Sequence, residues 1–417
     1  NDGENLPIDG ENPRLQRMGL LANCLTNLGV DVLWWQSTFD HYKKRFRYQE
    51  CQDTAINDKL RLILIHSVGY NKNVCVRRLY HHYDEARQFY KKALNFEKPD
   101  VMVVCMPTIA FTHYATKYAK KNNIPIIVDV RDLNPDVYVS PFHGITKALV
   151  KIGIKPLQWC LSNSLKRASG LIGTTQPYLD WALAYAGRTQ CDNDRVYFVS
   201  YQDKGLRTSL ENRERWSKFK TSTRLTCCFF GQFGRLVDFD TIIATAALCK
   251  KNDTPVNFIL CGSGEYLEKY KTIVNEKQLD NVFLPGWVNQ DDIQDVGYIS
   301  DLGLMSYYDD KNFNMQMTNK FSEYLSLGLG ILLQPTGVML DVIKKNSCGV
   351  HFKNAEELHI ILNSFITNPE NLKKMKSNAR ELFEKEFSAQ KVYTEYGKFL
   401  MSNAKKSVSY THLTLPT

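Results

Sequence analysis

The segment TNKFSEYLSLGLGILLQPTG, residues 318–337, joins a short amphipathic helix to a buried strand at 331–333. Asn319 stands at the expected N-cap, so the helix begins near Lys320. A lysine beside the free N–H groups of a helix start favours an anion, and phosphate is the usual one. An amphipathic core helix with a solvated Lys–Glu pair explains this segment alone equally well. The apolar face of the expected helix comprises Phe321, Tyr324, Leu325 and Leu327.

Strand-like and helix-like segments alternate along the rest of the chain, which is the pattern of βαβ units with a parallel sheet. In the first half we expect strands at 30–37, 60–67, 101–107, 125–132 and 170–175. After residue 223 the pattern restarts, with further strands expected within 225–234, 257–270, 281–287 and 302–308. The sequence therefore predicts an α/β protein with two Rossmann-like domains that face each other across a cleft.

The domain boundaries follow from changes in composition. We expect an N-terminal domain at 1–203 whose first strand is missing, because the chain begins directly with a loop and a helix. The polar, aperiodic segment 204–222 is typical of a linker, and the second domain spans 223–387. A helix at 388–407 is expected to pack back toward the N-terminal domain. Residues 408–417 have no pattern continuous with the rest and are interpreted as a non-native tail.

Composition indicates a soluble globular protein. Of the 417 residues, 43% are hydrophobic and 23% are charged. Eleven cysteines occur without a CxxC motif, which predicts reduced thiols in a cytoplasmic protein. No apolar run approaches the roughly 20 residues of a membrane span, and no signal peptide is visible.

Basic residues concentrate in the first half of the chain. The first 200 residues hold 26 Lys and Arg against 19 Asp and Glu. Within 147–167, apolar side chains alternate with cations, and such a segment could lie on an anionic lipid surface. No nucleic-acid-binding module is recognisable, so we expect no nucleic acid partner, while a solvated basic helix remains the alternative. The expected acceptor and membrane face comprises Lys147, Lys151, Lys155 and Trp159.

Several loops of the second domain follow expected strands, at the edge where parallel sheets bind ligands. Glycines in these loops let the backbone approach a diphosphate, and an arginine or lysine could pair with it. A single G-x-G is weak evidence, and a turn without a ligand is the alternative. The candidate ligand-binding residues, which the resemblance described next implies to be a nucleotide-sugar site, are Gly231, Gly234, Arg235, Gly262, Gly264, Gly286, Val288, Asn319, Lys320 and Glu323.

The order of these motifs resembles the donor half of retaining GT-B glycosyltransferases of family 4, especially the subgroup that makes bacterial capsule and O-antigen polysaccharides. The segments that carry the resemblance are FFGQFGR, ILCGSGE, LPGWV and TNKFSEYLSLGLGIL. In the first domain LPIDGENPRLQRMGLLANCL and DVRDLNPD (129–136) are similar to further motifs of that subgroup. The resemblance covers about residues 1–400. It implies a GT-B fold and transfer of a sugar from a nucleotide diphosphate sugar with retention of configuration.

The resemblance also implies roles for single residues. Glu323 matches the second Glu of the family's E-x7-E pattern, which holds the ribose hydroxyls, while Lys320 and Arg235 match cations that face the diphosphate. Such cations stabilise the charge that grows on the leaving phosphate. Asp132, at the end of a strand of the first domain, is expected to face the cleft where donor sugar and acceptor meet and is the catalytic candidate on the transfer side. The first Glu of the pattern would fall at position 315, which is Met in this chain.

The implied donor is a UDP-linked sugar, with an N-acetylamino sugar as the candidate because Met315 offers an apolar contact. The implied acceptor is a polyprenyl-linked saccharide, reached by an enzyme that lies peripherally on the inner face of the cell membrane. No metal or other cofactor is expected, since no Asp-x-Asp stands at a strand end. A nucleotide-sugar epimerase of the same fold and an inactive scaffold that retains the cleft are the alternatives.

Overall fold

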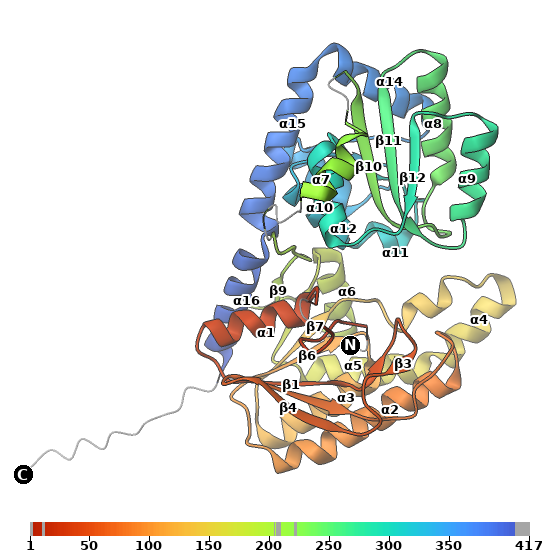
Figure 1. The fold of residues 1–417 in the computed structure, drawn as a ribbon. Coiled ribbons are helices and arrows are strands. Elements are labelled where there is room, and N and C mark those ends of the chain that lie inside the picture. The colour runs from red at the N-terminus through yellow and green to blue at the C-terminus, as the bar shows by residue number, and fades with distance from the viewer. Residues whose placement is uncertain (1–2, 11–12, 204, 206–209, 221–222, 405–417) are drawn as a thin grey trace, which may run out of the picture. The chain divides into compact units, whose positions relative to one another are not determined.

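The computed structural model describes residues 3–10, 13–203, 205, 210–220 and 223–404, in two compact units (Figure 1). The N-terminal unit comprises Asn1–Tyr197 and Tyr393–Thr417, and the C-terminal unit comprises Phe198–Val392. Helix α16 (Ala389–Asn403) therefore starts in the C-terminal unit and ends in the N-terminal unit. The predicted tail at 408–417 lies outside the described residues. Among the described residues, no helix combines the length and the hydropathy that a membrane crossing needs.

A parallel sheet forms the centre of the C-terminal unit, with the strand order β12-β11-β10-β13-β14-β15. This is the doubly wound order of a Rossmann fold, in which the direction of winding reverses between the first and fourth strands. Here these strands are β10 and β13. The strands are β10 Leu225–Gln232, β11 Val256–Ser263, β12 Val282–Gly286, β13 Leu302–Met305, β14 Gly330–Leu333 and β15 Gly349–His351.

Helices cover this sheet because its strands are continuous apolar runs that must be buried on both faces. In Figure 1, α8 and α14 lie side by side, and α7 packs against α10. Helix α12 packs on β14 and on α15. The helices are α7 Leu210–Ser217, α8 Phe239–Lys251, α9 Leu267–Glu276, α10 Gln290–Ile299, α11 Lys311–Asn314, α12 Asn319–Ser326, α13 Val338–Asn346, α14 Ala355–Thr367 and α15 Pro369–Leu382, followed by the π-helical turn η3 Phe383–Phe387.

The N-terminal unit contains two larger sheets rather than the single parallel sheet that the sequence predicts. One is parallel and has the order β6-β7-β8-β9. In the other, β1 pairs in parallel with β5, while β4 runs antiparallel to β5. The strands are β1 Val32–Ser37, β4 Gln52–Asn57, β5 Leu60–Ile65, β6 Met102–Met106, β7 Ile126–Val130, β8 Gly170–Gly173 and β9 Arg195–Val196, with the short hairpin β2 Phe39–Asp40 and β3 Arg45–Phe46.

Strand β4 was not predicted because its sequence, QDTAIN, has no apolar run. Its side chains alternate between half-buried and exposed, as expected for a strand at the edge of a sheet. The helices of the unit were predicted better; α2 packs on α3, and α5 lies between α3 and α6. They are α1 Arg17–Asn27, α2 Val76–Lys92, α3 Ile109–Asn122, α4 Gly144–Gly153, α5 Lys155–Arg167 and α6 Gln176–Ala186, with the 3-10 turns η1 Ala93–Asn95 and η2 Asp136–Val139.

Part of the predicted linker is a helix of the C-terminal unit. Within 204–222, α7 packs against α10. Trp216 is buried there, and its indole N–H donates to Asp292 at 2.9 Å. The segment predicted as a linker therefore contains a helix with a buried tryptophan, although its composition is polar.

Candidate active site at the carboxyl edge of the C-terminal sheet

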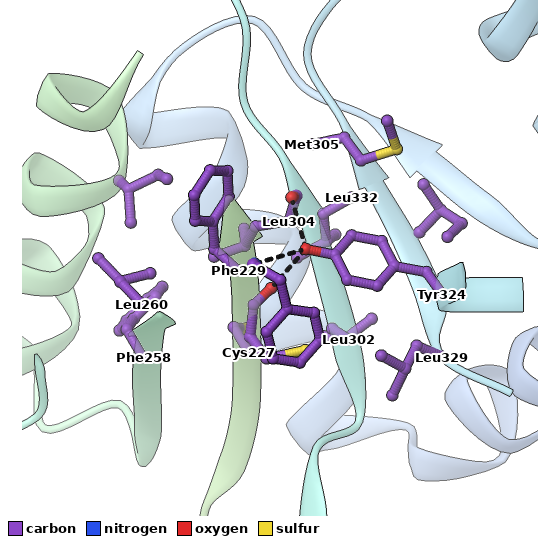
Figure 2. Packing of buried hydrophobic residues seen from close by; sticks show 14 of the residues in the cluster. Cys227, Phe229, Phe258, Leu260, Leu302, Leu304, Met305, Tyr324, Leu329 and Leu332 are labelled. Carbon is purple, nitrogen blue, oxygen red and sulfur yellow. Dashed lines mark hydrogen bonds between the residues drawn. The ribbon is translucent and has the colours of Figure 1, made fainter. Parts of the chain in front are cut away.

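The two central strands of the C-terminal sheet separate before they reach the carboxyl edge. β10 and β13 pair only at Cys227 with Leu302 and at Cys228 with Gly303. Beyond this point the hydroxyl of Tyr324, from α12, lies between them (Figure 2). It accepts from the backbone N–H of Phe230 at 3.3 Å and donates to the carbonyl of Leu304 at 3.2 Å.

Gly303 leaves room for this tyrosine, since a Cβ atom at position 303 would come within 2.5 Å of the Tyr324 ring. The strand order reverses at the same place, and open α/β sheets bind their ligands beyond the carboxyl ends of the strands at this reversal. The fold therefore points to the residues that follow β10 and β13 as the candidate site.

Lys320 stands at this position, in the first turn of α12. The N-cap is Thr318 rather than the predicted Asn319, because the Thr318 hydroxyl accepts from the backbone N–H of Phe321 at 3.3 Å. Lys320 Nζ donates to the hydroxyl of Tyr307 at 2.6 Å. The same nitrogen lies 3.6 Å from the centroid of the Phe229 ring. Although Lys320 is only half-buried by exposed area, its ammonium group is enclosed by aromatic rings.

This enclosure changes the acidity of the lysine. Loss of hydration lowers the pKa of Lys320 to about 7, while the nearby charge of Glu323 acts in the opposite direction. A bound anion would favour the charged form of the lysine and raise its pKa again. Lys320 can thus bind an anion near neutral pH, and the binding of that anion increases the fraction of the lysine that is charged.

Glu323 lies one helical turn after Lys320 and is buried. Positions three residues apart share one face of a helix. The structure thus brings the predicted cation and the predicted carboxylate together on α12. Asn319 is exposed at the first position of the helix.

The glycines at the ends of β10 and β11 let the backbones of the two strand ends and their following loops pack closely against each other. Gly231 pairs with Gly262 in the register of the two strands, and a Cβ atom on Gly262 would overlap the Gly231 carbonyl. A Cβ atom on Gly264 would lie 2.5 Å from the carbonyl oxygen of Phe233. Gly262 and Gly264 also have φ angles of +153° and +147°, which favour glycine. Close backbone packing therefore explains both residues without a ligand.

The remaining predicted residues of the first loop are more open. Arg235 is exposed, and its nearest ionic partner is Glu265, 3.8 Å away in the loop after β11. Two exposed side chains at this distance form a weak pair, so the guanidinium can turn to another anion at low cost. A Cβ atom on Gly234 would meet no atom nearer than 3.8 Å, and no steric reason for glycine exists there.

The third predicted loop begins at the end of β12. Gly286 has a φ angle of +87° and open space around it, and Val288 is buried. Trp287 between them is 71% exposed. Met315, at the position of the absent Glu, is the half-buried C-cap of α11.

Asp132 belongs to the N-terminal unit, directly after β7. Burial raises the pKa of its carboxyl group, and the charges of Arg78 and Arg131 oppose the shift. The neighbouring carboxylate Asp129 has a structural role. It is buried and accepts from Arg17 Nε at 2.7 Å and from the Tyr396 hydroxyl at 3.2 Å.

The predicted membrane face is an apolar surface with cations. Helix α4 buries none of its residues, although Leu149 and Ile152 lie on it. Trp159, on α5, is 70% exposed. Lys147 is half-buried, and Lys151 and Lys155 are exposed.

Sequence reasoning missed the aromatic residues around Lys320. Tyr307 follows β13 by two residues, and Phe229 lies near the end of β10. The signal was present, because both occupy carboxyl ends of the two strands at which the winding reverses. Only the structure shows that both rings meet the lysine.

Comparisons with known proteins agree with this fold. The family model of glycosyl transferases group 1 matches residues 211–382. No curated protein matches the chain in sequence. Among solved structures, sucrose-phosphate synthase from Thermosynechococcus elongatus is similar with a TM-score of 0.64 and 13% identity, over 92% of both chains.

Two further structures are similar over most of their length. WaaG, a glycosyltransferase involved in lipopolysaccharide biosynthesis, has a TM-score of 0.62 at 14% identity, over 91% of this chain and 94% of WaaG. HepE from Anabaena, in complex with UDP, has a TM-score of 0.60 at 14% identity, over 76% of this chain and 82% of HepE. The fold is that of the GT-B enzymes, and residues 211–382 of the C-terminal unit match the group 1 glycosyl transferases.

Proposed function

We propose that the chain transfers a sugar from a UDP-linked donor to a saccharide or lipid-linked acceptor, with retention of the anomeric configuration, in surface polysaccharide biosynthesis. The observation that carries the proposal is the position of Lys320. Its ammonium group lies at the start of α12 and beside the end of β10, where the winding of the sheet reverses. A helix start and a lysine together favour the diphosphate of a nucleotide sugar.

The chemistry needs a fixed cation at the leaving group. When the anomeric bond breaks, negative charge grows on the phosphate oxygen, and a preoriented ammonium group stabilises that charge. Arg235 can add a second cation, because its exposed pair with Glu265 is weak. With these cations at the diphosphate we also propose that the transfer needs no metal.

The nucleoside end of the donor is assigned to Glu323, whose carboxylate would accept hydrogen bonds from the two ribose hydroxyls. The backbone around Gly286 and Val288 would face the base. HepE has been solved with UDP and with UDP-glucose, which supports uridine as the nucleoside. Met315 offers an apolar contact to the donor sugar, in keeping with an N-acetylamino substituent.

Titration calorimetry on the whole protein tests the donor, with UDP, GDP and ADP as probes and then UDP-sugars. We expect binding of UDP and weaker or no binding of the other two. Binding of GDP or ADP without binding of UDP would overturn the choice of donor. Incubation with a UDP-sugar alone, followed by product analysis, separates the transferase from an epimerase, which would convert the donor without an acceptor.

For the acceptor we propose a polyprenyl-linked saccharide, reached when α4 docks on the anionic inner face of the cell membrane. The support is that Ile145, Leu149 and Ile152 are exposed on a helix that also carries lysines. Apolar side chains with cations suit an interface between lipid and water. A cavity of about 410 Å³ beside α4 is lined by Asp136, Val139, Lys151, Ile154, Lys155 and Gln158.

A further inference from the structure

Among the described residues, the Lys320 ammonium group donates one hydrogen bond, to the hydroxyl of Tyr307. The Tyr307 ring is buried and packs against Phe313, with 4.5 Å between the ring centroids. On the other side of the lysine, the Phe229 ring packs against Phe239 with the centroids 5.1 Å apart. Both rings are therefore held by their own neighbours and cannot move away from the lysine without disrupting the core.

Gly231 closes the third side of this enclosure. A Cβ atom at position 231 would come within 2.7 Å of Lys320 Nζ and 3.1 Å of the Phe229 ring. The absence of a side chain on Gly231 thus gives the ammonium group its place at the end of β10. The lysine is confined by a hydroxyl, a ring face and a backbone, each fixed in the fold.

We propose that Tyr307 is a positioning residue for the transfer: its hydroxyl keeps the Lys320 side chain against the Phe229 ring, so that the donor diphosphate meets an already oriented amine. The inference rests on the proposed function, because it needs a diphosphate at this site. Tyr307 itself acts through the lysine.

Three groups face the Lys320 ammonium group, and they differ in whether they can change charge near neutral pH. From α12 the facing group is Glu323, from β10 it is Cys228, and after β13 it is Tyr307. Burial raises the pKa of Cys228 to about 12 and raises the pKa of Tyr307 as well, so both stay neutral at physiological pH. The lysine is therefore the group that takes up a proton when an anion arrives.

Competitive acetylation of the whole protein without any donor tests the positioning. Peptide mass spectrometry gives the reactivity of Lys320 against pH, and the midpoint in the native protein is expected at about 7. In Tyr307→Phe, which keeps the ring, the lysine can swing into water, and we expect the midpoint to rise towards that of an ordinary lysine. Tyr308→Phe is the matched control. Tyr308 is half exposed, and its hydroxyl interacts with Asp238 instead of Lys320.

Steady-state kinetics supply the second measurement. We expect Tyr307→Phe to lower kcat roughly 10²-fold, the scale for a catalytic group that is slightly misplaced, with little change in the KM for the donor. Tyr308→Phe should turn over like the native protein. A Tyr307→Phe protein with native kcat and an unchanged or lower acetylation midpoint would overturn the proposal.

The experiments distinguish a failure of the proposed function from a failure of the role proposed for Tyr307. If the native protein neither binds nor uses UDP-sugars, the proposed function is wrong, while the acetylation midpoint still reports whether Tyr307 confines Lys320. If the native protein is active but Tyr307→Phe has the acetylation midpoint and the kcat of the native protein, the proposed function stands and the proposed role of Tyr307 is wrong.

Discussion

Gly231 and Gly262 lie side by side at the paired ends of β10 and β11, and the backbone of Gly231 occupies the space that a side chain on Gly262 would need. The contact fixes the end of β10, where Gly231 also borders the Lys320 ammonium group. The geometry of the proposed diphosphate site therefore depends on the absence of a side chain at Gly262.

Gly262→Ala should destabilise the C-terminal unit. The new methyl group overlaps a backbone carbonyl, and the φ angle of +153° adds strain, so we expect a loss of about 1–3 kcal/mol in the free energy of unfolding. Urea denaturation followed by circular dichroism measures it. Gly234→Ala is the control for stability, because its nearest new contact is 3.8 Å away. Equal unfolding midpoints for the two variants would contradict the steric argument.

Lys320→Ala should lose about 2–4 kcal/mol of transition-state stabilisation, the usual scale for one electrostatic donor in such a site. The effect should fall on kcat more than on the KM for the donor, since charge on the leaving phosphate is largest in the transition state. Lys311→Ala, at an exposed lysine of α11, is the matched control. Native turnover of Lys320→Ala would remove this residue from the mechanism.

Donor affinity should depend on pH through Lys320. The pKa of about 7 in the free protein lies below that in the complex, because the diphosphate favours the charged amine. Binding then takes up a proton above pH 7, and the affinity falls by up to about tenfold per pH unit as the pH rises. Below pH 7 the affinity should level off. Calorimetry with UDP-glucose from pH 6 to 9 checks this, and the slope should vanish in Lys320→Met.

Membrane docking should depend on α4. The protein should float with anionic vesicles at low salt and be released by added salt, because screening acts over about 8 Å at physiological ionic strength. Each Lys near such a surface contributes about 1 kcal/mol. Replacing Lys147, Lys151 and Lys155 with Glu should abolish flotation and leave UDP binding unchanged.

The matched control for flotation makes the same change of charge at exposed lysines away from α4, namely Lys91, Lys98 and Lys121. This variant should still float. If the native protein stays in the soluble fraction at low salt, the docking proposal fails and a soluble acceptor becomes the better hypothesis.

Asp129→Asn should destabilise the N-terminal unit. The carboxylate is fully buried against the Arg17 guanidinium, and removing one partner of such a pair costs about 3–5 kcal/mol. Urea denaturation measures the loss. Asp53→Asn breaks an exposed pair with Arg61 and should change the stability by less than about 1 kcal/mol. A similar loss in both variants would contradict the importance of burial.

The sequence predicted those parts of the fold that depend on apolar runs. Strands β10, β11 and β14 of the C-terminal sheet contain continuous apolar segments, and their expected positions agree with the structure. Strand β4 was missed because an edge strand buries only one face. The helix in the predicted linker was missed because its buried residue Trp216 stands among charged residues.

The site was predicted in the same uneven way. Lys320 was singled out because a helix start is visible in the sequence and Glu323 because it matches a family pattern, and the structure places both on α12. Tyr307 was missed because it is 13 residues away from Lys320 in the sequence. The sequence does not show that the segment between them folds so that the tyrosine hydroxyl meets the lysine. Gly262 was interpreted as a ligand contact, whereas the structure explains it by the backbone opposite.

Helix α16 also sets the order in which the chain can fold during synthesis. During synthesis Asp129 leaves the ribosome well before Tyr396, which donates a hydrogen bond to it. All of Phe198–Val392 leaves the ribosome before Tyr396 does. The N-terminal unit is thus begun first but completed only after the C-terminal unit, and a stop codon shortly after Val392 would leave the C-terminal unit whole and the N-terminal unit without Tyr396.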